Sequence, residues 1–174
     1  MVYLGIDPGA SGGLAVVKGN NVTLIKMPST EAEVWDVFQC SEVDFAVIEQ
    51  VGGYTKASGG GEGGGAANGS AMFKFGRSYG MLLMALTAAQ IPFEEVHPAK
   101  WQKGLGIAPK HKGKKKVVGL AANTVVVGSE SKVQFKNRLK HKAEQLFPGV
   151  KVTLATSDAL LLAEYGRRLR EGKL

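Results

Sequence analysis

The chain opens with a strand, an acid and a glycine-rich turn, and this segment restricts the fold more than any other. Residues 2–6 are apolar or small, which predicts a buried strand, and they end at Asp7. A proline and three glycines within residues 8–13 mark a tight turn. A second apolar run, residues 14–17, follows at once. The chain therefore forms a hairpin with one carboxylate at the tip of a strand that we expect to be central.

An ionised carboxylate at the end of a buried strand costs free energy unless something pairs with it. A metal ion is one such partner, and a backbone cap within the glycine turn is the other. Aspartate is common in turns because it hydrogen-bonds locally, so Asp7 alone favours the cap. Acids later in the chain shift the interpretation toward a metal site.

Three further strands extend the pattern. Residues 22–27 follow a Gly-Asn-Asn turn and predict a third antiparallel strand. Residues 43–50 contain a continuous apolar run, as expected of a central strand covered on both faces, and this strand ends near a second acid, Glu49. Residues 92–96 predict a short fifth strand. Two acids at the carboxyl ends of buried strands meet if the strands are neighbours.

Helices are predicted around these strands from caps and apolar spacing. They cover residues 31–39 behind Ser29 or Thr30, residues 71–90, a segment from His97 and Pro98, residues 132–147 behind Ser129 or Ser131, and a last segment from Thr156 or Ser157. Gly76 and Gly80 lie on one face of the second helix, a spacing that favours close packing against a strand or another helix of the chain, with the helix of a partner as the alternative. The stripe predicted to be apolar in the fourth helix comprises Val133, Phe135, Leu139, Ala143 and Leu146.

The last predicted helix carries two acids of different expected roles. Asp158 lies in its first turn, where the helix dipole stabilises a carboxylate, so a purely structural role is open to it as well as a metal-binding one. Glu164 lies two turns further on and is expected at the surface.

Two segments interrupt this α/β pattern within what we expect to be a single domain, residues 1–174. Residues 52–70 are rich in glycine and predict a flexible loop beside the site. This loop is no P-loop because it lacks the Gly-Lys-Ser/Thr ending. Residues 108–130 predict a basic insertion.

A net charge of +7 indicates a polyanionic partner such as nucleic acid. Much of this charge follows Lys100, and phosphate contact is favoured there over a merely solvated surface. The residues predicted to contact DNA are Phe73, Phe75, Arg77, Lys100, Lys103, Lys110, Lys112, Lys114, Lys115 and Lys116. The two phenylalanines fit base stacking or the core equally well.

Several protein classes are excluded by simple counts. No apolar run approaches the roughly 20 residues of a membrane span, and the single cysteine, Cys40, rules out an internal disulfide and a cysteine-rich zinc site. The chain enters a strand directly, so we expect no signal peptide. The expected location is the cytoplasm of a bacterial or phage-infected cell.

Asp7, Glu49 and Asp158 are therefore three acids at element ends, far apart in sequence. Oxygen ligands of this kind bind hard cations such as Mg²⁺. Two such ions held about 4 Å apart promote hydrolysis of a phosphodiester. A three-strand meander with an Asp, a strand ending in Glu and a last helix starting with Asp is also the order of RNase H-like nucleases.

The chain also resembles RuvC-type Holliday junction resolvases, especially phage and prophage members. The segments that carry the resemblance are GIDPGASGGLAVV, AVIEQV, MFKFGRSYGMLLMAL, VHPAKWQKGLGI and SDALLLAEYGRR. The resemblance implies an RNase H-like sheet and a homodimer that cuts two symmetric strands of a four-way junction with Mg²⁺ or Mn²⁺. It implies that Asp7, Glu49 and Asp158 bind two metal ions, and that Phe73 or Phe75 enters the junction. No nucleotide cofactor or membrane is expected.

One feature departs from that family. A fourth metal-site residue, Asp or His, is usual three or four positions before Asp158, where this chain has Ala155 and Leu154. Ser157, Thr156 or Glu164 is a candidate to compensate.

Three alternatives stay open. The first is a branched-DNA binding protein with weak or lost catalysis, and the second is a flap or branched-DNA nuclease of the same fold. The third is a sugar-kinase-like or chaperone-like ATPase, because GIDPGASGG also resembles the phosphate turn of that superfamily. Those ATPases need two such lobes, and 174 residues supply one.

Overall fold

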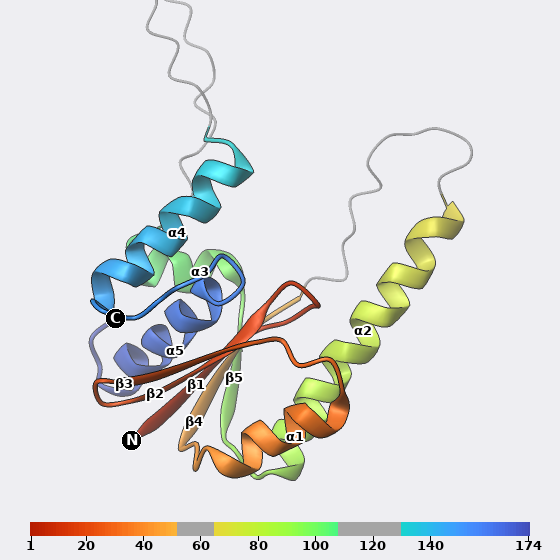
Figure 1. Ribbon diagram of the computed structural model, residues 1–174, viewed down its shortest axis with the longest axis horizontal. Helices are drawn as coiled ribbons and strands as arrows, with labels where there is room; N and C mark the ends of the chain where they lie inside the picture. The colour runs from red at the N-terminus through yellow and green to blue at the C-terminus, as the bar shows by residue number, and fades with distance from the viewer. Residues whose placement is uncertain (52–64, 108–129) are drawn as a thin grey trace, which may run out of the picture.

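The computed structural model describes residues 1–51, 65–107 and 130–174, and its centre is a five-stranded mixed sheet (Figure 1). The strand order is β3-β2-β1-β4-β5. The strands are β1 (Val2–Asp7), β2 (Gly13–Lys18), β3 (Asn21–Lys26), β4 (Phe45–Glu49) and β5 (Phe93–Val96). The first three are antiparallel, and β4 and β5 run parallel to β1. The predicted RNase H-like α/β architecture is confirmed.

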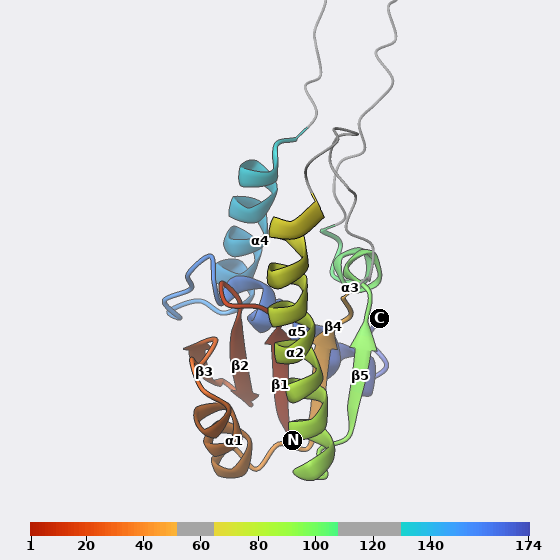
Figure 2. The same ribbon diagram turned by 90° about the vertical axis from the view of Figure 1, so that its right-hand side faces the viewer.

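Five helices in the described residues cover the two faces of the sheet. They are α1 (Glu31–Cys40), α2 (Gly65–Ala88), α3 (Pro98–Gly104), α4 (Lys132–Leu146) and α5 (Ser157–Arg170). Helices α1 and α2 lie on one face, and α3, α4 and α5 lie on the other (Figures 1 and 2). Within the described residues, no helix is long and apolar enough to cross a membrane.

Alternation along the strands divides the core into two clusters. Successive side chains of a strand point to opposite faces, so Leu4, Ile6 and Ile48 pack with α1 and α2. Tyr3 and Val47 pack with α3, α4 and α5. The apolar runs of β1 and β4 are therefore strands buried on both sides.

Helix α5 makes the closest approach to the sheet. A β carbon added at Gly5 would collide with the carbonyl oxygen of Ala159, so only glycine lets β1 and α5 pack at this distance. The helix is also covered from outside by α3 and α4. Its residues from Ser157 to Gly166 are all buried as a result.

The expectation that Glu164 lies at the surface was wrong. Its side chain is 1% exposed, and its two oxygens pair with Arg167 and Arg168, each at 2.7 Å. A buried charge is tolerated when it is paired and hydrogen-bonded in this way. The two arginines follow within one turn, so the helix itself supplies the compensation.

Helix α2 differs from the prediction in its start and in its packing. It begins at Gly65, so the last part of the glycine-rich segment is helical, while residues 52–64 lie outside the described part of the chain. Gly76 and Gly80 have no atom near a would-be β carbon, so the predicted close packing is absent among the described residues. The fully buried side chains of α2 are Leu82 and Leu86.

The helix starts mostly follow the predicted caps. Thr30 caps α1 and Ser131 caps α4, each in a reciprocal capping box with the residue three positions later. Pro98 occupies the first turn of α3 behind His97. At α5 the cap prediction was wrong, because the Thr156 hydroxyl interacts with Thr153 and makes no cap bond.

Candidate metal and nucleic-acid site

Asp7 and Glu49 lie side by side because β1 and β4 are parallel neighbours. The last paired residues of the two strands are Ile6 and Ile48, and the two acids each come one residue later. Since Ile6 and Ile48 face α1 and α2, alternation turns Asp7 and Glu49 toward the α5 face. The two strand-end acids predicted to meet do so.

Asp158 reaches the same place from the first turn of α5. The helix packs along β1 and β4, and the side chain of Asp158 is largely buried, at 8% exposure. The Ser157 hydroxyl lies 3.0 Å from Asp158 Oδ1 and donates a hydrogen bond to it. Two strands and one helix therefore bring three acids from distant parts of the sequence to one edge of the sheet.

The pKa values show that the three acids share one environment. Burial, and after it the neighbouring Asp158 and Glu49 carboxylates, raise the pKa of Asp7 to about 7. Burial is also the main cause of the raised pKa of Glu49 and of Asp158. Within the described residues no salt bridge includes any of the three.

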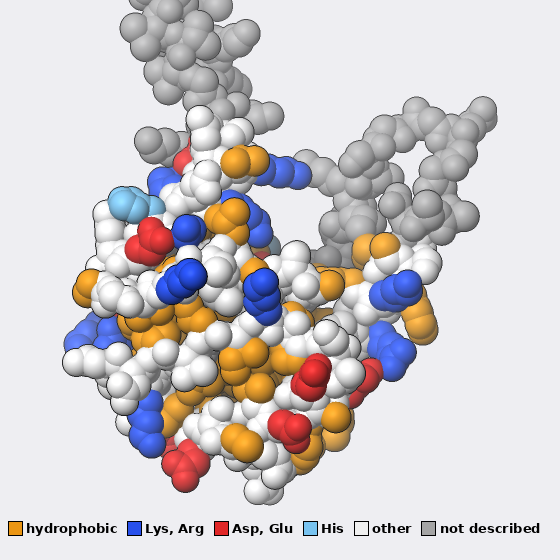
Figure 3. All heavy atoms as spheres, in the orientation of Figure 1, with side chains coloured by type: hydrophobic (Ala, Val, Ile, Leu, Met, Phe, Trp, Pro, Cys, Tyr) orange, Lys and Arg blue, Asp and Glu red, His pale blue; other side chains and the backbone are white. Residues whose placement is uncertain are grey.

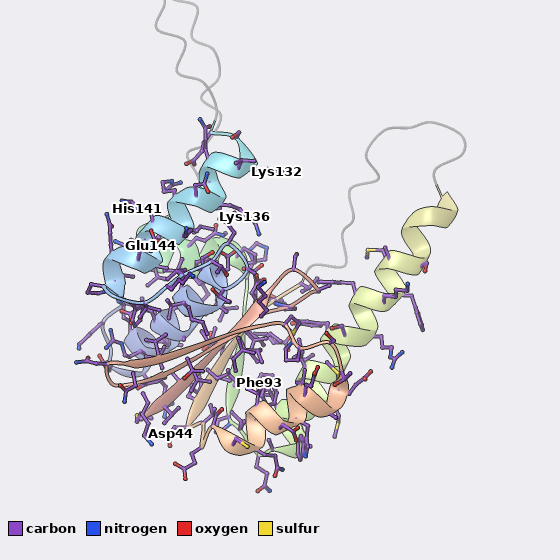
Figure 4. All side chains as sticks on the ribbon, in the orientation of Figure 1. Asp44, Phe93, Lys132, Lys136, His141 and Glu144 are labelled. Atoms are coloured by element: carbon purple, nitrogen blue, oxygen red, sulfur yellow. The ribbon has the colours of Figure 1, made fainter. Side chains whose placement is uncertain are left out.

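Lys136 of α4 is the basic residue that acts on all three carboxylates. Its positive charge lowers the pKa of Asp7, Glu49 and Asp158, against the effect of burial. Lys136 lies on the same side of the helix as the buried Leu139, one turn earlier. Figure 4 shows Lys132 and Lys136 on the side of α4 nearer to α2, and His141 on the far side.

Trp101 of α3 makes the most direct contact with one of the acids. Its indole Nε1–H donates a hydrogen bond of 2.8 Å to Glu49 Oε2. The Trp101 side chain is 0% exposed and belongs to the core cluster on the α5 face. A buried neutral donor therefore fixes one carboxylate oxygen of the site.

The donor set fits a hard divalent cation by its chemistry. The raised pKa values show that ionisation of the three carboxyl groups is poorly compensated, and a cation would supply that compensation. Mg²⁺ and Mn²⁺ favour oxygen ligands. As the side chains stand, no three His, Cys, Asp or Glu residues in ranges 1–51, 65–107 and 130–174 form a group able to hold a metal ion. The type of donor groups therefore supports a metal site here, although the described side chains do not form a closed set of ligands.

Solved structures share this architecture. RuvC of Thermus thermophilus in complex with a Holliday junction substrate superposes with a TM-score of 0.60 at 18% identity, covering 99% of this chain and 97% of that one. A second Thermus thermophilus RuvC structure gives a TM-score of 0.58 at 19% identity, covering 99% and 98%. The chain has the RuvC fold. No family model and no curated protein matches the sequence.

On this RuvC fold the two predicted aromatic residues differ sharply. Phe75 packs against the β1–β2 turn, where its Cε2 would lie 3.0 Å from a β carbon at Gly9. Gly9 also has a φ of 105°, a conformation that favours glycine. Phe73, two residues earlier on α2, is 75% exposed. Only Phe73 therefore presents a free ring.

Basic side chains flank the carboxylate edge of the RuvC fold on both sides. Figure 3 shows Lys and Arg side chains over α4 and over α2 on this face. Arg77 of α2 pairs with Glu31 at 2.7 Å, while Lys100 of α3 pairs with Glu94 at 2.8 Å. Both pairs are exposed, and Lys103 is exposed as well. Lys110, Lys112, Lys114, Lys115 and Lys116 lie outside the described residues.

None of the three candidates supplies a free side chain in place of the fourth metal-site residue, Asp or His, that the resemblance to RuvC-type proteins implies. Leu154 and Ala155 lie in the turn before α5 and supply no ligand side chain. Thr156 is bonded to Thr153, and Glu164 is held by two arginines. Ser157 remains, and it already donates to Asp158.

Two residues of the site were not predicted from the sequence. Lys136 is one of several basic residues in α4, and the sequence fits a phosphate-facing helix as well as a merely soluble one. The apolar stripe predicted for this helix also includes Val133, which is 69% exposed. Lys132 and Lys136 lie at helical spacing before the buried Leu139 and Ala143, so all four side chains are on the same side of α4. This spacing can be recognised in the sequence. Trp101 had no such signal, because nothing in the local sequence links an indole to Glu49.

Proposed function

We propose that the protein is a metal-dependent, structure-selective endodeoxyribonuclease that resolves four-way DNA junctions by paired, symmetric hydrolysis. The observation that carries the proposal is the meeting of Asp7, Glu49 and Asp158 at one sheet edge of a RuvC fold. The junction substrate of the similar RuvC complex supports branched DNA as the substrate class. The reaction unit would be the single domain formed by residues 1–174.

The three acids would hold the divalent ions. The Asp158 and Glu49 carboxylates both act on Asp7, so we assign Asp7 to both ions, and Glu49 and Asp158 to one ion each. Bound Mg²⁺, or Mn²⁺ in its place, supplies an activated water and stabilises the leaving oxygen. The side chains would turn toward each other on binding, because repulsion among them is then replaced by attraction to the ions.

Lys136 would contact the DNA at the reacting phosphate. Its ammonium group acts on all three carboxylates, so a phosphate brought to the site comes within its reach. A lysine in this position neutralises the substrate charge without reading the base sequence. Water then attacks the phosphorus in line, and the products carry 5′-phosphate and 3′-hydroxyl ends.

Phe73 and the surface lysines would hold the branched DNA. An exposed ring on the outer half of α2 can stack on an unpaired base at a junction. Arg77, Lys100 and Lys103 would exchange their present exposed ion pairs or solvent for phosphates, and the lysines from Lys110 to Lys116 would add phosphate contacts. Selectivity would then come from DNA shape.

A homodimer would place two sites on the two symmetric strands. The exposed side of α2 carries Gly76, Gly80 and Met84 at spacings of four residues, with Met84 62% exposed. Small residues at such spacing let a second helix approach closely, so we propose a second copy of this chain as the partner. Met84→Glu should then shift the protein from dimer to monomer in analytical ultracentrifugation, whereas an unchanged mass would reject this interface. The cell interior of a bacterium or an infected bacterium is the proposed compartment.

The missing fourth acid favours one other candidate. With Leu154 and Ala155 in its place, the protein would bind branched DNA tightly and cut it weakly or not at all. A nuclease of the same fold that acts on flaps is a further alternative that the same assay separates.

The test compares a synthetic four-way junction, a flap and a linear duplex of matched sequence, in Mg²⁺ and in Mn²⁺. Paired symmetric nicks on the junction only, abolished by Asp7→Asn with junction binding retained, are expected. Nicks on flaps alone would select the flap nuclease. Tight junction binding without nicks in either metal would select the binding protein, and Ala155→Asp would then be tested for gain of cleavage.

A further inference from the structure

We propose that Trp101 is a positioning residue that orients the Glu49 carboxylate through its indole N–H. The inference rests on the proposed function, because it takes Glu49 as a ligand of the metal site. Trp101 would touch neither metal nor DNA, and it would act only through Glu49.

The chain path places Trp101 beside Glu49 for a structural reason. Glu49 pairs with Val96 at the end of β4 and β5, and the amide of Gln50 donates to the Val96 carbonyl at 2.9 Å. Helix α3 begins two residues later at Pro98. Its first turn therefore starts next to the acid, and Trp101 turns back under it.

The contact has the geometry of a specific bond and not of general packing. The Nε1–H to Oε2 distance of 2.8 Å lies in the range of charge-assisted hydrogen bonds. Since the bond occupies only part of one oxygen, the rest of the carboxylate stays open to a ligand.

An indole is well suited to this position. Its N–H donates and cannot accept, and it carries no charge. It therefore neither competes with a cation for the carboxylate nor binds the cation itself. The indole is also completely buried among core side chains such as Leu105 and Tyr165, so its orientation is fixed before metal or DNA binds. Outer partners of this kind set the direction of a metal ligand.

Indole ¹⁵N–¹H spectroscopy tests the bond and its link to metal. The chain has two tryptophans, Trp35 and Trp101, so the spectrum has two indole cross-peaks, which Trp35→Phe and Trp101→Phe assign. In EDTA, Glu49→Gln should move the Trp101 peak and leave the Trp35 peak in place. Titration with Mg²⁺ should move the same Trp101 peak in the wild type and not in Glu49→Gln.

Kinetics on the junction separate positioning from packing. Trp101→Phe keeps a buried aromatic ring and removes the N–H, so we expect kcat to fall by about 10- to 100-fold. The Mg²⁺ concentration for half-maximal rate should rise, and junction affinity measured in EDTA should not change. Higher Mn²⁺ should restore part of the rate. The matched control, Trp35→Phe on α1, should keep the wild-type rate and Mg²⁺ dependence.

The outcomes distinguish this inference from the proposed function. If the wild type cuts junctions, and Trp101→Phe does so with unchanged kcat and Mg²⁺ dependence, the positioning role is wrong while the nuclease stands. An indole peak that ignores Glu49→Gln also overturns it. If the wild type cuts no DNA and neither indole peak responds to Mg²⁺ or Mn²⁺, the proposed function fails and the inference fails with it.

Discussion

Helices α5 and α2 pack on opposite faces of one sheet, yet they differ in almost every physical respect. From Ser157 to Gly166, α5 is buried residue by residue, even at Asp158 and Glu164. In contrast, α2 buries Leu82 and Leu86 but exposes Phe73 and Met84, and its outer glycines contact nothing in the described part of the chain. Figure 2 shows α2 running in front of the sheet with its first turns beyond the strand ends.

This difference indicates that the two helices have different roles. A helix clamped between the sheet and two other helices holds a side chain in place, which a reaction centre requires. A helix with an exposed apolar side is suited to contacts between molecules. Helix α5 therefore serves the chemistry and α2 serves recognition.

The largest expected effect comes from the same substitution made on each side of the sheet. Gly5→Ala should lower the free energy of unfolding by about 3 kcal/mol or more, because the new methyl group meets the backbone of Ala159 in α5. Gly80→Ala, made in the monomeric Met84→Glu background so that no second helix packs on it, should raise it by roughly 0.5–1 kcal/mol, because alanine favours a helix and the chain itself leaves space there. Urea denaturation of both variants measures the contrast. Equal effects would show that α5 is not held more tightly than α2.

A second test uses the pH dependence of stability in EDTA. The pKa of Asp7 is raised from its ordinary value of 3.8 to about 7, so the folded state binds this proton more tightly than the unfolded state. The free energy of unfolding should therefore fall as pH rises from about 4 to about 7, by on the order of 2–3 kcal/mol. Asp7→Asn should lack most of this slope, and Mg²⁺ should reverse the loss at the upper pH.

Parallel pH profiles for the wild type and Asp7→Asn would contradict this account. They would mean that a local backbone cap in the glycine turn stabilises the ionised Asp7, as the turn alone first suggested.

A third test removes the buried charge of α5 away from the site. Glu164→Gln should lower the free energy of unfolding by about 2 kcal/mol, because Arg167 and Arg168 lose their partner but are exposed enough to be solvated. The metal dependence of cleavage should not change. Glu171→Gln, at an exposed pair, is the matched control with little effect. Lost cleavage without lost stability would instead mean that Glu164 supplies the missing fourth ligand.

The smallest expected change in stability comes from the outer half of α2. Phe73→Ala should change the free energy of unfolding by less than about 0.5 kcal/mol, and it should weaken junction binding by roughly tenfold through lost stacking. Phe75→Ala should lower the free energy of unfolding and leave junction binding nearly unchanged, because its ring packs against the turn at Gly9. Gel-shift titration in EDTA with thermal melts separates the two. Equal loss of binding in both variants would remove the distinction.

The sequence predicted the sheet and two of the acids because local rules decide them. Apolar runs that end on Asp7 and Glu49 define strand ends, and parallel pairing then brings those ends together. Asp158 was suggested by its place in the first turn of a helix and by the resemblance to RuvC-type proteins. The strand order itself follows from the three-strand hairpin start and short parallel strands.

What the sequence did not predict depends on contacts between distant elements. Glu164 was expected at the surface, but tertiary packing around α5 buries it. Its ion pairs with Arg167 and Arg168 make this burial tolerable. Gly76 and Gly80 suggested packing within the chain, since spacing alone cannot tell a buried face from an exposed one. The contact from Trp101 to Glu49 joins residues 52 positions apart, and no local pattern encodes it.

The most direct test of the central claim is anomalous diffraction from crystals of the wild-type protein soaked in MnCl₂. We expect anomalous density within ligating distance of carboxylate oxygens of Asp7, Glu49 and Asp158, with the three side chains drawn together around it. Trp101 should still donate to Glu49 in that structure. Absence of density at this edge at saturating Mn²⁺, with the acids capped by backbone amides instead, would contradict the claim that they form a metal-dependent reaction centre.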